Sequence, residues 1–269
     1  MPGIRVAALW VYPVKACRAV SMDRARVGRR GLDDDRRFMV IDPDGTFLSQ
    51  RTEPRLATVT TIVDDGVLRL SADGHASVAV PCAPTSRERR PVRVHSSYAS
   101  SAWSMGTEAA RFLSEVLGRA AELVKMPDDE ERRVAAKHAP EGALVSFADA
   151  FPLLLTSSTS LDDLSERAGT PIPMARFRPN VVVSGAAPYD EDRWSRLRIG
   201  DVFFRAPKLC DRCVVTTTDQ LSGARGPEPL RTLATYRAWD GAVWFGTNLV
   251  PESEGDVAVG DHVEVVDRR

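Results

Sequence analysis

The chain has 269 residues, of which 43% are hydrophobic, and its 36 basic and 37 acidic residues leave a net charge of −1. This length and apolar content are sufficient for one large or two modest domains with a buried core. The balanced charge provides no global attraction to nucleic acid or to an anionic membrane, so any basic site must be local.

The first apolar stretch ends at Tyr12-Pro13 and is too short for a signal peptide or a membrane span. We therefore expect a cytoplasmic protein with neither a membrane nor a nucleic acid as its partner. Four cysteines are too few for the disulfide framework of a secreted domain, which favours a reducing compartment. The four histidines are scattered singly, and this disfavours a structural zinc site.

The first hundred residues show short β-prone segments separated by turns. Strands are expected at Ile4 to Val11, Arg37 to Asp42, Thr46 to Gln50, Thr58 to Val63, Val67 to Ser71 and Ala76 to Pro81. Asp64-Asp65-Gly66 and Ala72-Asp73-Gly74 are typical of hairpin turns. The even spacing predicts an antiparallel barrel or sandwich.

A helix is expected next, from Thr107 to Leu117, because apolar residues recur at helical spacing and Gly118 provides a stop. The charge-dense stretch from Asp128 to Arg133 is typical of a solvated loop and is a candidate linker or flap. We therefore expect two domains, residues 1–126 and residues 127–269.

The second half combines strands with two helices. A strand from Phe151 to Leu155 should lead into a short helix that is capped by Ser158 or Thr159 and ends at Gly169. Further strands are expected at Asn180 to Ser184, Leu197 to Arg205, Cys213 to Thr218, Val243 to Val250 and His262 to Val266, and a second helix at Pro229 to Trp239. The expected class is mainly β with some α (α+β).

Polar side chains stand beside several of these strands, while the usual nucleotide, serine hydrolase and zinc protease motifs do not occur. The polar groups are Lys15, the pair Arg36-Arg37, the run from Ser157 to Ser160, and Arg178 with Asn180. Each has an ordinary explanation as a surface charge, a solvated turn, a helix cap or an edge-strand residue. If they point at one spot, hydroxyl donors, forked guanidiniums and a helix N-terminus suit an anion such as phosphate.

Cys210-Asp211-Arg212-Cys213 contains two thiols three positions apart. A thioredoxin-like redox pair requires such a motif at a helix N-terminus, whereas the β-branched run Val214 to Thr218 predicts a strand. This context favours Cys213 as a lone thiolate that binds a thiophilic metal.

Three motifs and the chain's ending resemble a known family. They are Tyr12-Pro13-Val14-Lys15, Phe177-Arg178-Pro179-Asn180, the stretch from Cys210 to Thr217, and Gly260-Asp261. Together they resemble the MOSC superfamily with its N-terminal MOSC β-barrel domain, in the class of the mitochondrial amidoxime-reducing component and bacterial reductases of N-hydroxylated compounds. The resemblance implies an N-terminal β-barrel domain followed by a MOSC β-barrel with short helices, which binds the molybdenum cofactor (Mo-molybdopterin).

The resemblance also assigns roles to single residues. Cys213 would be the molybdenum ligand and the catalytic residue, while Cys210 matches a cysteine with no agreed ligand role. The implied cofactor-binding residues are Lys15, Arg36, Arg37, Ser157, Ser158, Ser160, Arg178, Asn180, Arg212 and Cys213. One departure is Ala16, where the family often has a serine, and this change removes one hydroxyl contact to the phosphate.

The activity that the resemblance implies is reduction of amidoximes, hydroxylamines or N-oxides by a molybdenum-dependent oxidoreductase. Electrons would come from a separate ferredoxin, flavoprotein or cytochrome b5-like protein, because the chain has no further cysteines with cluster spacing. Asp211 and Asp219 are candidates for proton transfer. The alternatives are a molybdenum cofactor carrier, persulfide transfer at Cys213, and a thiol–disulfide protein.

Overall fold

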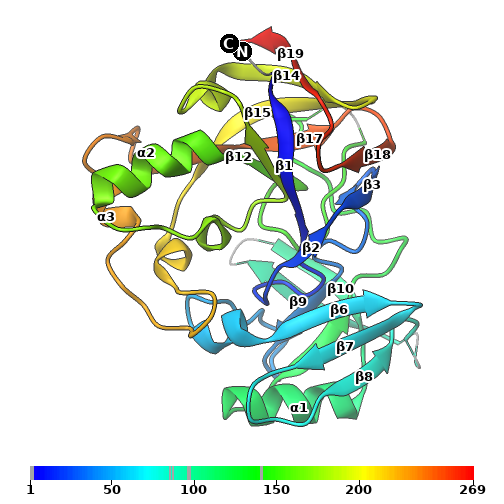
Figure 1. Ribbon diagram of the computed structural model, residues 1–269. Helices are drawn as coiled ribbons and strands as arrows, with labels where there is room; N and C mark the ends of the chain where they lie inside the picture. The colour runs from blue at the N-terminus through cyan, green and yellow to red at the C-terminus, as the bar shows by residue number, and fades with distance from the viewer. Residues whose placement is uncertain (1–2, 85, 87, 96–97, 140–141) are drawn as a thin grey trace.

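A nine-stranded sheet forms the upper half of the molecule in Figure 1. The computed structural model describes residues 3–84, 86, 88–95, 98–139 and 142–269. The strands of the large sheet are β1 (Arg5–Val11), β2 (Val20–Met22), β12 (Leu153–Ser157), β13 (Val181–Ser184), β14 (Trp194–Ile199), β15 (Val202–Asp211), β16 (Ala238–Trp239), β17 (Ala242–Pro251) and β19 (Val263–Arg268). Their order is β19-β14-β15-β17-β12-β13-β1-β2, with β16 paired to β17.

One parallel pair interrupts this otherwise antiparallel sheet. Strands β12 and β13 run parallel, with Leu155 opposite Val181, and parallel neighbours need a crossover connection. Helix α2 (Ser158–Ala168) lies in that connection, beside the short helix α3 (Leu230–Leu233) at the left of Figure 1.

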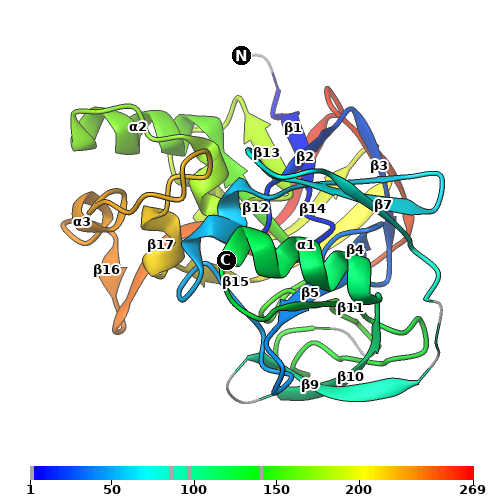
Figure 2. The same cartoon turned by 90° about the horizontal axis from the view of Figure 1, so that it is seen from below.

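The described residues also form three smaller sheets and a further α-helix. The smaller strands are β3 (Arg24–Gly28), β4 (Gly31–Leu32), β5 (Phe38–Ile41), β6 (Thr60–Asp64), β7 (Val67–Ser71), β8 (Val78–Pro81), β9 (Arg89–His95), β10 (Tyr98–Ser104), β11 (Glu122–Lys125) and β18 (Gly255–Ala258). They form the sheets β18-β3-β4, β5-β11-β10-β9 and β6-β7-β8. Helix α1 (Thr107–Leu117) crosses the lower end of the molecule, as Figure 2 shows from below.

Helix α1 confirms the expected apolar stripe. Its buried side chains are Ala109, Phe112, Leu113, Val116 and Leu117. They join the apolar cluster around Leu56 in the lower half, whereas a separate cluster around Trp194 lies in the upper half. The helix ends where Gly118 adopts a left-handed φ of 68°, a conformation that glycine reaches without steric cost.

The expected class, mainly β with some α, is confirmed. The strand at Val67–Ser71 matches the expected bounds, and other expected strands shift by one to two residues. The expected strand from Leu197 to Arg205 is two strands, because Gly200 turns the chain between β14 and β15 with a φ of 54°. Thr46 to Gln50 is not a strand: this segment contacts its neighbours through isolated bridges at Thr46 and Phe47.

The prediction of a strand from Cys213 to Thr218 is wrong. Val214–Thr217 is a 3-10 turn instead. The Thr216 hydroxyl donates to the Cys213 carbonyl at 2.9 Å, and the Thr217 hydroxyl donates to the Val214 carbonyl at 2.8 Å. Threonine side chains that bond to carbonyls three residues back offer the backbone an alternative to a strand ladder.

The helix expected from Pro229 to Trp239 is helical only over Leu230–Leu233 among these described residues. Trp239 pairs with Ala242 in the β16–β17 hairpin, and its ring stacks on Trp244 with 5.9 Å between ring centroids. Stacking in the hairpin overrides the helical pattern. The expected cap of α2 also moves by one residue, since Ser157 is the residue before the first helical turn.

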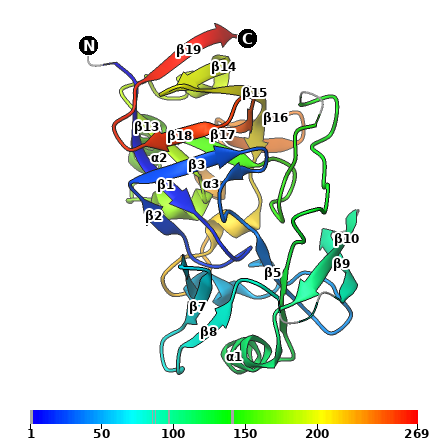
Figure 3. The same ribbon diagram turned by 90° about the vertical axis from the view of Figure 1, so that its right-hand side faces the viewer.

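The connection between the upper and lower halves bears on the domain prediction. Residues 126–139 lead from β11 of the lower half towards the upper half (Figure 3), where the expected linker lies. The first strand of the chain, β1, nevertheless pairs with β13 of the large sheet. The division into residues 1–126 and 127–269 stays a prediction.

Candidate functional site

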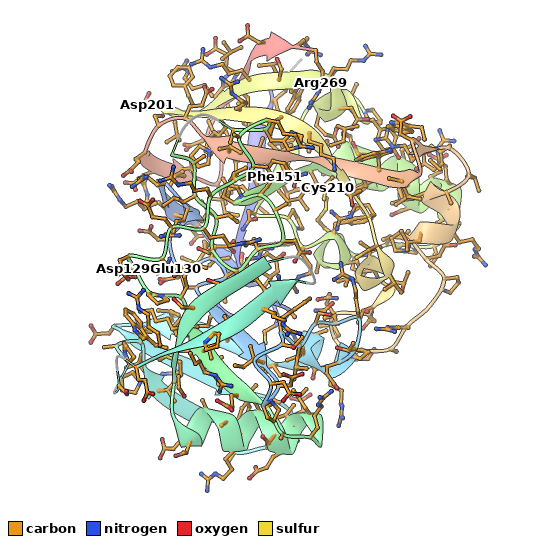
Figure 4. The ribbon with its side chains drawn as sticks, turned by 180° about the vertical axis from the view of Figure 1, so that it is seen from behind. Asp129, Glu130, Phe151, Asp201, Cys210 and Arg269 are labelled. Atoms are coloured by element: carbon orange, nitrogen blue, oxygen red, sulfur yellow. The ribbon has the colours of Figure 1, made fainter. Side chains whose placement is uncertain are left out.

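A cavity of about 310 Å³ lies where the segments after β1 and β5 meet the ends of β12, β13 and β15. Its charged lining residues are Lys15, Arg36, Arg51, Asp149, Arg178, Lys208, Asp211 and Arg212, and Gln50, Asn180, Cys210 and Cys213 also line it. Figure 4 labels two of the lining residues, Phe151 and Cys210, and Cys210 belongs to β15 of the large sheet. Six basic and two acidic side chains give this wall an excess of positive charge.

Cys213 lies at the wall of this cavity, two residues after β15 ends and directly before the 3-10 turn. In this turn the backbone N–H of Thr216 donates to the carbonyl of Cys213 at 3.0 Å. The Cys213 sulfur accepts a hydrogen bond from Arg51 Nη2 at 3.4 Å. The thiol is free and half-buried, so it is available to a ligand in the cavity.

Lys15 reaches the cavity from the segment after β1. Its Nζ donates to Asp149 Oδ1 at 2.6 Å and to the Val94 carbonyl at 3.3 Å. Burial lowers the pKa of Lys15, and the Asp149 carboxylate opposes that shift. The Lys15 ammonium in turn holds the pKa of Asp149 well below its usual range. Asp149 therefore stays ionised, and the exposure of 63% of its side chain favours the charged form as well.

Arg36 and Arg178 stack on the buried ring of Tyr12, at 4.2 and 4.3 Å from its centroid. Both have left-handed backbone conformations, with φ of 49° and 56°, which non-glycine residues adopt at a cost that tertiary contacts must offset. Asn180 Oδ1 accepts from Arg36 Nη1 at 2.9 Å. Burial lowers the pKa of Arg178 to about 10, Tyr12 opposes this shift and Arg36 adds to it.

Arg212 lies between the two cysteines of its motif and is held at both ends of its guanidinium. Its Nη1 donates to Cys210 Sγ at 2.8 Å and its Nη2 donates to the Phe177 carbonyl at 2.8 Å. Its Nε is buried and has no hydrogen-bond partner within the described part of the chain. Burial raises the pKa of Cys210, against the effect of Arg212. Cys210 therefore acts as a neutral acceptor that fixes Arg212.

Four of the expected site residues lie elsewhere. Arg37 turns away to Asp128, at 2.6 Å, and to the Met126 carbonyl. Ser157, Ser158 and Ser160 lie at the start of α2, outside the described lining of the cavity. The structure therefore brings together Lys15, Arg36, Arg178, Asn180, Arg212 and Cys213, and it does not bring these four residues to them.

Ser157 and Ser160 have hydrogen-bond partners near the start of α2, a threonine hydroxyl for Ser157 and a buried carboxyl group for Ser160. Ser157 Oγ lies 2.7 Å from Thr159 Oγ1, and the Ser160 hydroxyl lies 2.7 and 2.9 Å from the two oxygens of Glu191. Glu191 is fully buried, and burial raises its pKa to about 7. We name Ser157, Thr159, Ser160 and Glu191 the α2 cluster. The hydroxyls of the α2 cluster are engaged in these hydrogen bonds, and the serines lie outside the described lining of the cavity.

Sequence reasoning missed Gln50, Arg51 and Asp149. Arg51 follows a segment that was expected to be a strand, and Asp149 lies in a bend before β12. Single charged residues in irregular segments carry no periodic signal, and their contacts come from distant parts of the chain. Of the two aspartates considered for proton transfer, Asp211 lines the cavity, whereas Asp219 Oδ1 accepts hydrogen bonds within its own turn from Leu221 and Ser222.

Comparison with known proteins places this architecture in a family. The MOSC N-terminal beta barrel domain matches residues 3–120, and the MOSC domain matches residues 143–264. Mitochondrial amidoxime reducing component 2 of Rattus norvegicus is 34% identical over 278 residues, which cover 96% of this chain and 82% of the relative. The chain belongs to the MOSC family of the amidoxime-reducing components.

Two further relatives show the breadth of this MOSC family. Mitochondrial amidoxime-reducing component 1 of Homo sapiens is also 34% identical, and the match covers 96% of this chain and 82% of the relative. Molybdenum cofactor sulfurase of Oryza sativa subsp. japonica is 28% identical, and the match covers 97% of this chain but 35% of the much longer relative. Among the described helices of the present MOSC protein, none has the length and apolar character to cross a membrane.

Proposed function

We propose that this MOSC protein binds the molybdenum cofactor and reduces N-hydroxylated small molecules. The observation that carries the proposal is a free thiol, Cys213, in a cavity whose charged lining residues are mostly basic. The names of the relatives point to the same chemistry, amidoxime reduction for one group and the molybdenum cofactor for the rice protein.

The donor set fits such a cofactor. Among the described residues, no group of three or more His, Cys, Asp or Glu side chains could hold a metal ion by itself. A metal at Cys213 would therefore arrive with ligands of its own, as it does in a pterin dithiolene. The buried Nε of Arg212 has no protein partner, and guanidiniums pair well with phosphate oxygens. Both features suit a ligand that carries a thiophilic metal and an anionic group.

Five residues would hold the cofactor. Lys15, Arg36, Arg178 and Arg212 would contact its phosphate and pterin, and the Cys213 thiolate would bind the molybdenum. Asn180 acts on Arg36, because its Oδ1 accepts from Arg36 and its amide donates to the Trp10 carbonyl at 3.1 Å. Bound molybdenum supplies the two-electron redox chemistry that the side chains lack.

Two features of the chain would serve the substrate. Asp149 is held ionised by Lys15 and faces the cavity, so its carboxylate can accept a hydrogen bond from a substrate hydroxyl. The second feature is the ion pair of Lys208 and Asp211, whose side chains lie 3.3 Å apart on the wall of the same cavity. The electron donor in this proposal is a separate protein, a ferredoxin, a flavoprotein or a cytochrome b5-like protein.

The two cysteines of the motif provide the test. Cys213→Ala should abolish reduction of an amidoxime or a hydroxylamine with an artificial electron donor, and metal analysis should show lost molybdenum. Cys210→Ala is the matched control and should retain most of the activity and most of the molybdenum, because the thiol of Cys210 bonds to Arg212 and to the Asp211 carbonyl and has no proposed contact with the metal. Full activity of the Cys213→Ala protein would contradict the proposal.

The same measurements separate the alternatives. Molybdenum without reduction of any N-hydroxy substrate would indicate a cofactor carrier. Protein that holds a labile persulfide on Cys213 and no molybdenum would indicate sulfur transfer, in line with the likeness to the rice sulfurase.

A further inference from the structure

Two glutamine side chains from distant parts of the sequence pair beside the cavity. Gln50 Nε2 donates to Gln220 Oε1 at 3.0 Å, and Gln220 Nε2 donates back to Gln50 Oε1 at 3.0 Å. Both side chains are buried, with 1% and 7% of the residue exposed. We name Gln50 and Gln220 the glutamine pair.

The remaining amide hydrogens of the glutamine pair are also bonded. Gln50 Nε2 donates to the Ala16 carbonyl at 2.7 Å, and Gln220 Nε2 donates to the Thr218 carbonyl at 3.1 Å. A buried polar network in which every donor is satisfied rigidifies its surroundings, whereas a partly satisfied one destabilises them. The glutamine pair therefore forms a fixed, uncharged link between the segment at residue 50 and the turn at residue 220.

This link reaches two cations of the cavity. Arg178 Nη1 donates to Gln220 Oε1 at 3.2 Å and to the Cys17 carbonyl at 2.7 Å. From the same turn, Arg225 donates to the carbonyls of Gln50 and Arg51. The side chain of Arg178 and the backbone of Arg51 are thus both held by the turn that carries Gln220, and Arg51 in turn contacts Cys213.

The hydrogen-bond partners of the Arg178 side chain are neutral oxygens. Arg51 differs, because its side chain donates to the Cys213 sulfur and lies 4.0 Å from Asp149 Oδ2. Arg178 and Arg36 share the ring of Tyr12 and repel each other, and burial already lowers the pKa of Arg178. A carboxylate in place of Gln220 would neutralise this charge, whereas an amide oxygen fixes the guanidinium and leaves its charge available. Donors that are oriented before the ligand arrives spare it the cost of ordering them.

We propose that Gln50 and Gln220 are positioning residues that hold Arg178 and Arg51 in place for an anionic group beside Cys213. Only the identity of that group, the cofactor phosphate, rests on the proposed function. The positioning itself is a property of the protein alone, and it can be measured on metal-free protein.

The measurement compares two reagents that alkylate the Cys213 thiol. Iodoacetate is anionic and iodoacetamide is neutral, so the ratio of their rates reports the positive potential at the sulfur. Trypsin separates the thiols, because cleavage after Arg212 and Arg225 leaves Cys213 in a peptide of residues 213–225 and Cys210 in residues 209–212. Mass spectrometry of the two peptides then gives the rate at each site.

Arg51→Gln is the positive control and should lower the iodoacetate to iodoacetamide ratio at Cys213 about three- to fivefold, which is the scale of one unit charge at about 4 Å in a water-filled site. Gln220→Met keeps both charges but frees the guanidiniums to move, so it should lower the ratio by a smaller factor of about two. Leu221→Ala is the matched negative control, because Leu221 lies on the same turn with 75% of its surface exposed. Its ratio should equal that of the wild type.

A thermal melt accompanies each ratio, so that a merely structural role is recognised. A folded Gln220→Met protein with a lower melting temperature and an unchanged ratio would overturn the proposal. If this variant does not fold, the alkylation ratio is measured on the double variant Gln50→Met/Gln220→Met instead. Replacing both partners by apolar side chains of similar shape leaves fewer polar groups unpaired. Absence of molybdenum from the wild-type protein would contradict the proposed function and would leave the alkylation result unaffected.

Discussion

The cavity around Cys213 and the α2 cluster differ in how their polar groups are satisfied. In the α2 cluster, hydroxyls bond to one another and to the Glu191 carboxylate, so the group is closed. In the cavity, Arg178 and Arg212 bond to carbonyl, amide and thiol acceptors, and the Nε of Arg212 has no partner within the described residues. Both regions contain residue types that can bind an anion. Only in the cavity is a described donor still free to bond to a ligand.

The largest effect is expected in the α2 cluster, where the pKa of Glu191 is raised to about 7 by burial. The native carboxyl then keeps its proton at pH values where the unfolded one, with a pKa of about 4.3, has lost it. Stability should therefore fall by about 3 kcal/mol as the pH rises from about 4 through 7. Glu191→Gln should remove this dependence, as urea unfolding at about pH 5 and about pH 8 would show. If the free energy of unfolding changed equally with pH in both proteins, the burial argument would be contradicted.

The next effect is expected in the cavity. Arg178→Met keeps an unbranched apolar stem but removes the charge that faces the proposed phosphate. Loss of a charge-assisted hydrogen bond of about 2 kcal/mol would weaken cofactor retention about thirtyfold. Metal analysis after dialysis would measure it. Retention equal to that of the wild type would remove Arg178 from the proposed cofactor site.

Ser160→Ala tests the closed character of the α2 cluster. It leaves the buried Glu191 carboxyl without its hydroxyl donor, which should cost about 1–2 kcal/mol of stability. Cofactor content should remain unchanged, since the cluster lies outside the described lining of the cavity. If the variant had wild-type stability but had lost molybdenum, the serines would be cofactor-binding residues after all.

The smallest effect is expected at Arg37. Its partner Asp128 has 82% of its side chain exposed, and pairs with an exposed partner contribute about 1 kcal/mol or less. Arg37→Met should change neither molybdenum content nor turnover, in contrast to the adjacent Arg36→Met. Loss of cofactor in both variants would show that Arg37 reaches the site in the loaded protein.

Several elements follow from local sequence alone. The apolar spacing in α1 and the turn residues around Val67–Ser71 led to correct bounds, because their burial pattern and their stop signals are local. The β-branched run after Cys213 misled, since the hydroxyls of Thr216 and Thr217 bond back to the carbonyls of Cys213 and Val214. β propensity describes how a side chain fits a sheet, and tertiary context overrides it.

The sequence by itself determined the β-rich class, the family motifs and Cys213 as the residue of interest. Only the tertiary structure decided that Arg51 and Asp149 join Lys15 and Arg178 at one cavity, and that Arg37 and the serines do not. The physical reason is sequence separation. Gln50 and Gln220 pair although 170 positions separate them in the sequence. The residue types along a chain do not determine which distant acceptor each donor bonds to.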